Sequence, residues 1–233
     1  MEKLIYVIWK PDGADIETFK HELLGSTAGE LIERGARGLS VNLADDLAAF
    51  ARQLRMTQMK EPMSGMVSVW MDTHLNRGPI EDALARITKR LAGYIVLESV
   101  PIVNTKHVPP LGERLPGLYT VAFLEKPDFL TYDAWREQWQ GHHTRVAIET
   151  QSTFLYIQNV CVRPLTKDAP PWTAIVEEAF PAEAATDPMV FYDAGGSKEK
   201  LAERQQLMIE SCQKFIDFKQ LESHPFSAYV LKR

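Results

Sequence analysis

A pair of histidines follows two tryptophans in the segment YDAWREQWQGHHTRVA, residues 132–147. A neutral imidazole near pH 7 can take a proton from carbon or oxygen and pass it on, so histidine is the first candidate for acid/base chemistry. His142 and His143 are therefore the candidate catalytic residues of this segment. An imidazole in such a role needs a partner that fixes its tautomer, and a carboxylate is suited to that task.

The run TAIVEEAF, residues 173–180, offers such a carboxylate. Glu177 and Glu178 are neighbours on an expected strand, so their side chains point to opposite faces of a sheet. Apolar neighbours would raise the pKa of a carboxyl group there and make it either a histidine-orienting group or an acid. We expect Glu177 to approach one of the histidines, directly or through one water, as the third catalytic residue. The alternative is a solvated glutamate on an edge strand.

A helical wheel at about 100° per residue gives the two histidines different environments. His142 falls within the apolar stripe that contains Trp135, and His143 falls at its edge, toward the expected pocket. On this phasing His142 is a buried, hydrogen-bonded core residue and His143 is the reactive one. A break of the helix at Gly141 would rotate the wheel and reverse the two roles.

The elements that carry these residues are repeated along the chain. WKPDGADIETFKHELLG, from Trp9, aligns without a gap with EKPDFLTYDAWREQWQG, from Glu125, and strand-like apolar runs flank both. Each half then has the order β-α-β-β-α-β, the ferredoxin-like arrangement, in which both helices cover one face of a four-stranded sheet. We expect α+β architecture, in which two tandem ferredoxin-like repeats pack sheet to sheet as a barrel within one chain. The gap between the sheets is the expected small-molecule pocket.

The expected division has three parts: a first repeat at 1–105, a Pro-rich linker at 106–116 and a second repeat at 117–233. The halves differ where chemistry is expected. Ser26 and Thr27 align with the histidine pair, and Ser68 aligns with Glu177. We therefore expect the second half to carry the site and the first half to form its lid and wall.

The second half resembles the EthD domain family of the dimeric α+β barrel superfamily. The first helix of that family carries an aromatic segment, one or two histidines and a short apolar stretch, which here are Trp135, Trp139, His142-His143 and Val146-Ala147. Its third strand carries an acidic residue, and Glu177 occupies that place. The first half follows the same element order with fewer of these motif residues.

Three functions are compatible with these features. The first is a cofactor-independent lyase, dehydratase or isomerase that acts on a hydrophobic, aromatic or polycyclic compound through histidine acid/base chemistry. The second is a binding or accessory protein of a degradation pathway, and the third is a haem protein, since some members of the superfamily hold haem through a helix histidine. In the first interpretation the side chains that contact the substrate are Trp139, Trp135, Tyr119, Phe123, Glu178 and Phe180. It involves no cofactor, and no spacing of His, Cys, Asp and Glu indicates a metal site.

Composition limits the partners. The chain has 233 residues, 45% of them hydrophobic, and a net charge of −5. Lys and Arg form no stripe with interleaved aromatics, so neither nucleic acid nor an anionic membrane is an expected partner. The apolar run LIYVIW near the start is too short for a signal peptide, and two cysteines give no disulfide framework. We therefore expect a cytoplasmic protein whose partner is a hydrophobic small molecule, with association into a homodimer left open.

Overall fold

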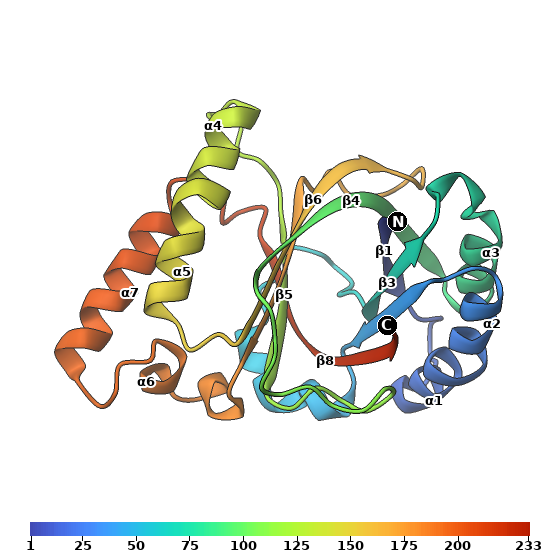
Figure 1. The fold of residues 1–233 in the computed structure, drawn as a ribbon, viewed down its shortest axis with the longest axis horizontal. Helices are drawn as coiled ribbons and strands as arrows, with labels where there is room; N and C mark the ends of the chain where they lie inside the picture. The colour runs from blue at the N-terminus through green and yellow to red at the C-terminus, as the bar shows by residue number, and fades with distance from the viewer.

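Eight antiparallel strands form a closed barrel in the computed structural model, which describes residues 1–233 (Figure 1). Around the barrel the strands follow the order β1-β3-β2-β8-β5-β7-β6-β4, and β4 then pairs with β1. The strands are β1 Glu2–Trp9, β2 Gly38–Leu43, β3 Gly65–Met71, β4 Arg90–Ile102, β5 Leu118–Leu124, β6 Leu155–Pro164, β7 Ala174–Phe180 and β8 Glu222–Lys232.

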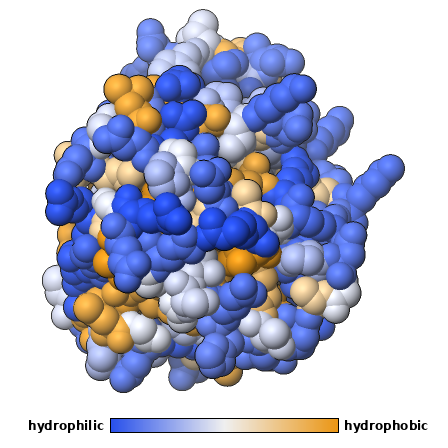
Figure 2. Space-filling model, turned by 90° about the vertical axis from the view of Figure 1, so that its right-hand side faces the viewer, coloured by the Kyte–Doolittle hydropathy of each residue, from blue (hydrophilic) through white to orange (hydrophobic).

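Two groups of helices cover opposite outer sides of the barrel (Figure 1). The first group is α1 Ile16–Glu22, η1 Leu23–Thr27, α2 Ala28–Glu33, η3 His74–Asn76 and α3 Gly78–Ile87. The helix η2 Asp46–Leu54 instead packs against β8 and lies beside the second group, where Ala51 joins a small core with Phe180 and Ala184. The second is α4 Tyr132–Arg136, η4 Glu137–His143, α5 Thr144–Thr150, η5 Ala182–Ala185, α6 Pro188–Phe191 and α7 Lys198–Cys212. The side of the molecule that carries α1, α2 and α3 is mostly hydrophilic, with apolar side chains in small separate patches (Figure 2). No helix has the length and apolar character needed to cross a membrane.

Local sequence signals explain where these helices begin. Asp15, Thr131 and Ser197 each precede a helix, and each side chain accepts a hydrogen bond from a backbone N–H of the first turn. This bond satisfies one of the free donors at a helix start, which stabilises the helix by about 1 kcal/mol.

The expected pair of separate sheets packed face to face is wrong, because the strands form one closed barrel. Strand β4 pairs with β6, with Leu97 opposite Val160, and β2 pairs with β8, with Asn42 opposite Ala228. An open sheet leaves unpaired N–H and C=O groups along both edge strands. Joining the edges of the two halves satisfies these groups and encloses the apolar inner surface.

Three apolar layers result from this closure. The barrel interior is filled at one end by large side chains that include Trp9, Phe123 and Trp172. A second core lies between the barrel and the helices α1, α2 and α3. A third core lies under α4, α5 and α7, where Trp135 donates from Nε1 to the Phe215 carbonyl oxygen at 3.1 Å.

The helix that carries the histidine pair contains a wide π-helical turn, η4, between α4 and α5. A π turn holds one residue more than an α turn and so shifts the faces of the helix that follow it. The wheel drawn from the sequence is therefore misphased after Gly141. His143 is buried with 8% of its surface exposed, whereas His142 is half-buried.

Candidate functional site

Strand alternation decides which side chains enter the barrel. On β7, Ile175, Glu177 and Ala179 face inward, while Glu178 and Phe180 face the outer layers. The two neighbouring glutamates therefore lie on opposite faces, as the sequence predicts. Glu177 is the one that reaches the barrel interior.

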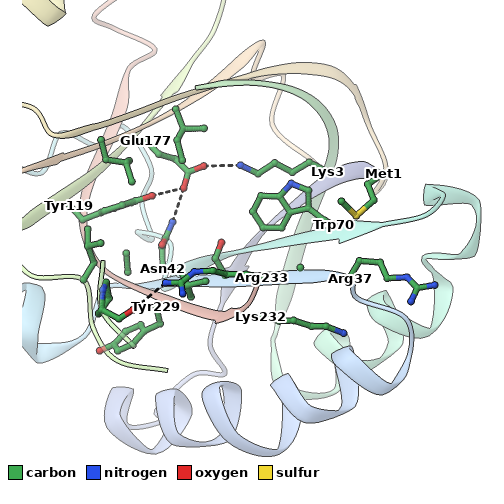
Figure 3. A pocket seen from close by; sticks show the side chains of 18 residues that line it. Met1, Lys3, Arg37, Asn42, Trp70, Tyr119, Glu177, Tyr229, Lys232 and Arg233 are labelled. Carbon is green, nitrogen blue, oxygen red and sulfur yellow. Dashed lines mark hydrogen bonds and ion pairs between the residues drawn. The ribbon is translucent and has the colours of Figure 1, made fainter. Parts of the chain in front are cut away.

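A cavity of about 360 Å³ opens at one end of the barrel, opposite the end that is filled by Trp9, Phe123 and Trp172. Both chain termini lie at this open end (Figure 3). Its volume lies within the range of small-molecule pockets. Its walls are mainly apolar. The lining residues are Met1, Lys3, Arg37, Gly38, Ser40, Asn42, Trp70, Pro109, Leu115, Tyr119, Leu155, Ile157, Glu177, Ala228, Tyr229, Val230, Lys232 and Arg233.

The Glu177 carboxylate sits in this pocket and accepts four hydrogen bonds, two on each oxygen. Figure 3 shows the three that come from Lys3, Tyr119 and Asn42. Tyr119 Oη and Asn42 Nδ2 donate to Oε2 at 2.7 and 3.3 Å. Asn159 Nδ2 and Lys3 Nζ donate to Oε1 at 3.0 and 3.2 Å. The donors come from four strands, so the closed barrel is what assembles this cluster.

Protonation in this cluster follows from burial and charge together. Burial alone would raise the pKa of Glu177, but the charge of Lys3 and the hydrogen bonds from Tyr119, Asn159 and Lys3 outweigh it, so the pKa is lowered. Burial, and then the nearby Glu177 charge, raise the pKa of Tyr119 well above its usual value. At neutral pH the site therefore holds an ionised carboxylate beside a protonated phenol.

Lys3 contacts a second carboxylate besides Glu177. Its Nζ donates at 2.5 Å to Glu98, whose side chain is 25% exposed. The same Nζ lies 4.8 Å from the centre of the Trp70 ring, a cation–π distance. Two carboxylates and one aromatic face thus fix the position of the ammonium group.

The structure does not bring the histidines to Glu177. His143 Nδ1 forms a hydrogen bond with Ser211 Oγ at 2.9 Å, and its ring packs on Phe215 under α7. Burial lowers the pKa of His143 to about 4, with a smaller effect from the neighbouring His142. His142 lines a groove of about 190 Å³ between α5 and α7, outside the barrel. Neither imidazole lines the barrel pocket, and their catalytic roles stay predictions.

The predicted substrate-contacting residues are divided between the two faces of the barrel wall. Tyr119 lines the pocket, and Phe123 faces the same interior but belongs to its filled end. Trp135 and Trp139 are buried in the core beneath the helices. Phe180 also lies outside the barrel, stacked on Phe191.

Glu178 lies outside the barrel as well, half-buried beneath the second group of helices. Desolvation raises its pKa to about 7. The carboxyl group that takes the raised pKa expected from apolar burial is thus Glu178 rather than Glu177.

Several residues of the site come from the first half of the chain and were not predicted. Lys3, Asn42 and Trp70 lie on β1, β2 and β3, and they face Glu177 and Tyr119 across the barrel. One signal was present in the sequence: a lysine and an asparagine at inward-facing positions of otherwise apolar strands. A polar side chain at such a position needs a partner inside the barrel.

No group of three or more His, Cys, Asp and Glu side chains is arranged to hold a metal ion. The histidine ligand that the haem interpretation needs is absent from the lining of the barrel pocket. The groove beside His142 is smaller than typical ligand pockets. The residues of this chain therefore do not fit a histidine-ligated haem at either place.

Comparison with known proteins identifies the fold. No protein-family model matches the sequence, and no curated protein matches it significantly. A solved structure described as an anthrone oxidase-like protein has a TM-score of 0.60 and 8% identity, over 100% of this chain and 94% of that one. A candidate monooxygenase from Lactobacillus acidophilus NCFM has a TM-score of 0.49 and 10% identity, over 99% and 96%. The first of these similarities shows that this chain shares the fold of the anthrone oxidase-like protein.

Proposed function

We propose that this chain is an enzyme that takes a hydrophobic, aromatic small molecule into the barrel pocket and removes a proton from it with Glu177. The observation that carries the proposal is an ionised carboxylate, 3% exposed, that faces a mainly apolar cavity. Buried carboxylates with perturbed pKa values in a pocket are typical of acid/base sites.

The hydrogen bonds to Glu177 define the kind of proton that it can remove. Two donors on each oxygen make the carboxylate a weak base, so the substrate proton must be fairly acidic. A phenolic O–H satisfies this condition, and so does the CH₂ group of an anthrone-type ketone, because its anion is delocalised through the aromatic rings onto the ketone oxygen. When Glu177 takes the proton, it loses its own charge, and its partner Lys3 can then balance the negative charge that the substrate gains.

Proton removal of this kind begins lyase and isomerase reactions, which we propose as the reaction class. The description of the structural neighbour as anthrone oxidase-like supports an aromatic ketone as the type of substrate. The motif around His142 and His143 supports membership of the EthD family. These histidines lie outside the pocket, so in this proposal they stabilise the helix layer and take no proton from the substrate.

Hydrogen–deuterium exchange of anthrone in D₂O under nitrogen, followed by NMR, tests the proposal without knowledge of the natural product. The wild-type protein should accelerate exchange of the ring CH₂ protons. Glu177→Gln keeps the shape and removes the charge, so it should reduce that acceleration by roughly 10²–10⁴-fold. Glu178→Gln, on the opposite face of the same strand, is the matched control and should retain it.

Equal exchange rates in the wild type and in Glu177→Gln would contradict proton removal by Glu177. If anthrone nevertheless bound in the pocket, the chain would be a binding protein rather than an enzyme.

A further inference from the structure

The mouth of the barrel pocket is cationic, although the chain as a whole carries a net charge of −5. Four basic side chains are among the lining residues: Lys3, Arg37, Lys232 and Arg233. Glu177 is the only acidic lining residue. The local balance of charge is therefore opposite to that of the whole molecule.

Two of these four cations have carboxylate partners. Lys3 pairs with Glu177 and Glu98, and Arg37 pairs with Asp72 at 2.8 Å. These pairs neutralise most of the charge of both basic groups, so neither is free to bind an anion.

Lys232 and Arg233 have no side-chain carboxylate partner. Lys232 Nζ donates to the Ala36 carbonyl oxygen at 2.9 Å, and Arg233 Nη2 donates to the Pro109 carbonyl oxygen at 3.1 Å. Each group keeps further N–H donors, since an ammonium has three and a guanidinium has five. At the end of β8 the two side chains run in opposite directions along the pocket mouth, with Arg233 directed toward Tyr229 and Lys232 directed away from it (Figure 3).

The wall between this edge and Glu177 is apolar. Trp70, Leu155 and Ile157 line it, together with Ala228 and Val230 on β8. An aromatic ring fits such a wall, whereas an anion placed deep in the pocket would meet the negative charge of Glu177. A ligand that is apolar at one end and anionic at the other is complementary to the pocket in a single orientation.

We infer that the substrate is an aromatic compound with an anionic substituent, such as a carboxylate or sulfonate, and that the positive charge of Lys232 and Arg233 holds this substituent at the pocket mouth. The inference rests on the proposed function, because it assumes that the reacting end of the substrate lies at Glu177. The two cations orient the substrate and take no part in proton transfer.

Two fluorescent probes of similar shape test this inference: 8-anilinonaphthalene-1-sulfonate, which is anionic, and N-phenyl-1-naphthylamine, which is neutral. The wild-type protein should bind the sulfonate more tightly, and added NaCl should weaken that binding. The double substitution Lys232→Met with Arg233→Met should weaken sulfonate binding by about tenfold, equivalent to about 1.4 kcal/mol. It should leave the Kd of the neutral probe unchanged.

The controls separate this inference from the proposed function. Lys198→Met removes an exposed cation at the start of α7 and should leave both Kd values unchanged. Ile157→Trp and Val230→Trp fill the pocket from two strands, and each substitution should weaken the binding of both probes. Sulfonate binding that survives the double substitution would overturn the inference alone. If neither filled variant weakens either probe, the probes bind elsewhere and the pocket itself is refuted as the ligand site.

Discussion

Among single residues, the candidate site depends on the buried ion pair between Lys3 and Glu177. Lys3 and Glu177 are 4% and 3% exposed, so each charge depends on the other and on the surrounding hydrogen bonds. Breaking a buried pair by removing one partner leaves an uncompensated charge, which costs far more than the pair itself contributes.

Lys3→Met should therefore destabilise the protein by about 3–5 kcal/mol, because it leaves the Glu177 carboxylate buried without its counter-charge. Adding Glu177→Gln to Lys3→Met should recover much of that loss. Urea unfolding of the two single variants and the double variant measures the coupling. Additive effects of the two substitutions would show that the groups do not interact.

His143 provides a second residue-scale prediction. Burial lowers its pKa to about 4, so between pH 6.5 and pH 4 the unfolded chain binds more protons than the folded one. Stability should therefore fall by up to about 3 kcal/mol as the pH drops across this window.

Unfolding free energies measured from pH 4 to 7 would test this contribution. His143→Gln should show a shallower dependence than the wild type, while His21→Gln, on the exposed surface of α1, serves as the control. If the unfolding free energy of His143→Gln depends on pH as steeply as that of the wild type, the lowered pKa of His143 is not the cause of the pH dependence.

Two of the residues predicted from the sequence, Glu177 and Tyr119, line the barrel pocket. Alternation on a strand predicted that Glu177 and Glu178 lie on opposite faces, because that pattern is local, but it did not decide which of them faces the pocket. Lys3 and Asn42 were missed because their contact with Glu177 spans 174 and 135 residues of chain. Only the closed barrel makes these residues neighbours.

At the level of the helices, the π turn in η4 explains why the burial of His142 and His143 is the reverse of what the wheel indicates. Regular helix geometry was assumed across Gly141, and one additional residue in the turn changes which imidazole is buried. Helix and strand order was readable from apolar periodicity and capping residues. The width of one turn was not, since it depends on packing under α7.

Deleting Gly141 should convert this turn into an α-helical one and leave the faces of α4 and α5 in place. Deleting Arg145, which is exposed on α5, should instead rotate every later residue of that helix by about 100° and disrupt its core contacts. Thermal unfolding should show a much smaller decrease in Tm for the Gly141 deletion than for the Arg145 deletion. Equal losses would mean that the π turn is required for the packing of this helix.

At the scale of the whole molecule, closure is the feature that the sequence did not reveal. The element order of each half was visible, but it is compatible with stacked sheets as well as with a barrel. The edge strands of the two halves decide between stacked sheets and a barrel, since β4 pairs with β6 and β2 pairs with β8. Backbone hydrogen bonds between the halves leave little sequence signal, because any residue except proline can form them.

These pairings predict that the two halves unfold together. Differential scanning calorimetry should give one transition in which the calorimetric and van't Hoff enthalpies agree. Two resolved transitions would show that the halves are independent domains and that the β4–β6 and β2–β8 pairings contribute little to stability.

The central claim is that the barrel pocket, and not the histidine groove, binds the aromatic ligand. A crystal structure of the protein soaked with anthrone tests it most directly. We expect density for the ring system in the barrel, between Trp70 and Ile157, with its CH₂ carbon within contact distance of the Glu177 carboxylate. Ring density confined to the groove beside His142 and Arg145, with the barrel pocket empty, would contradict it.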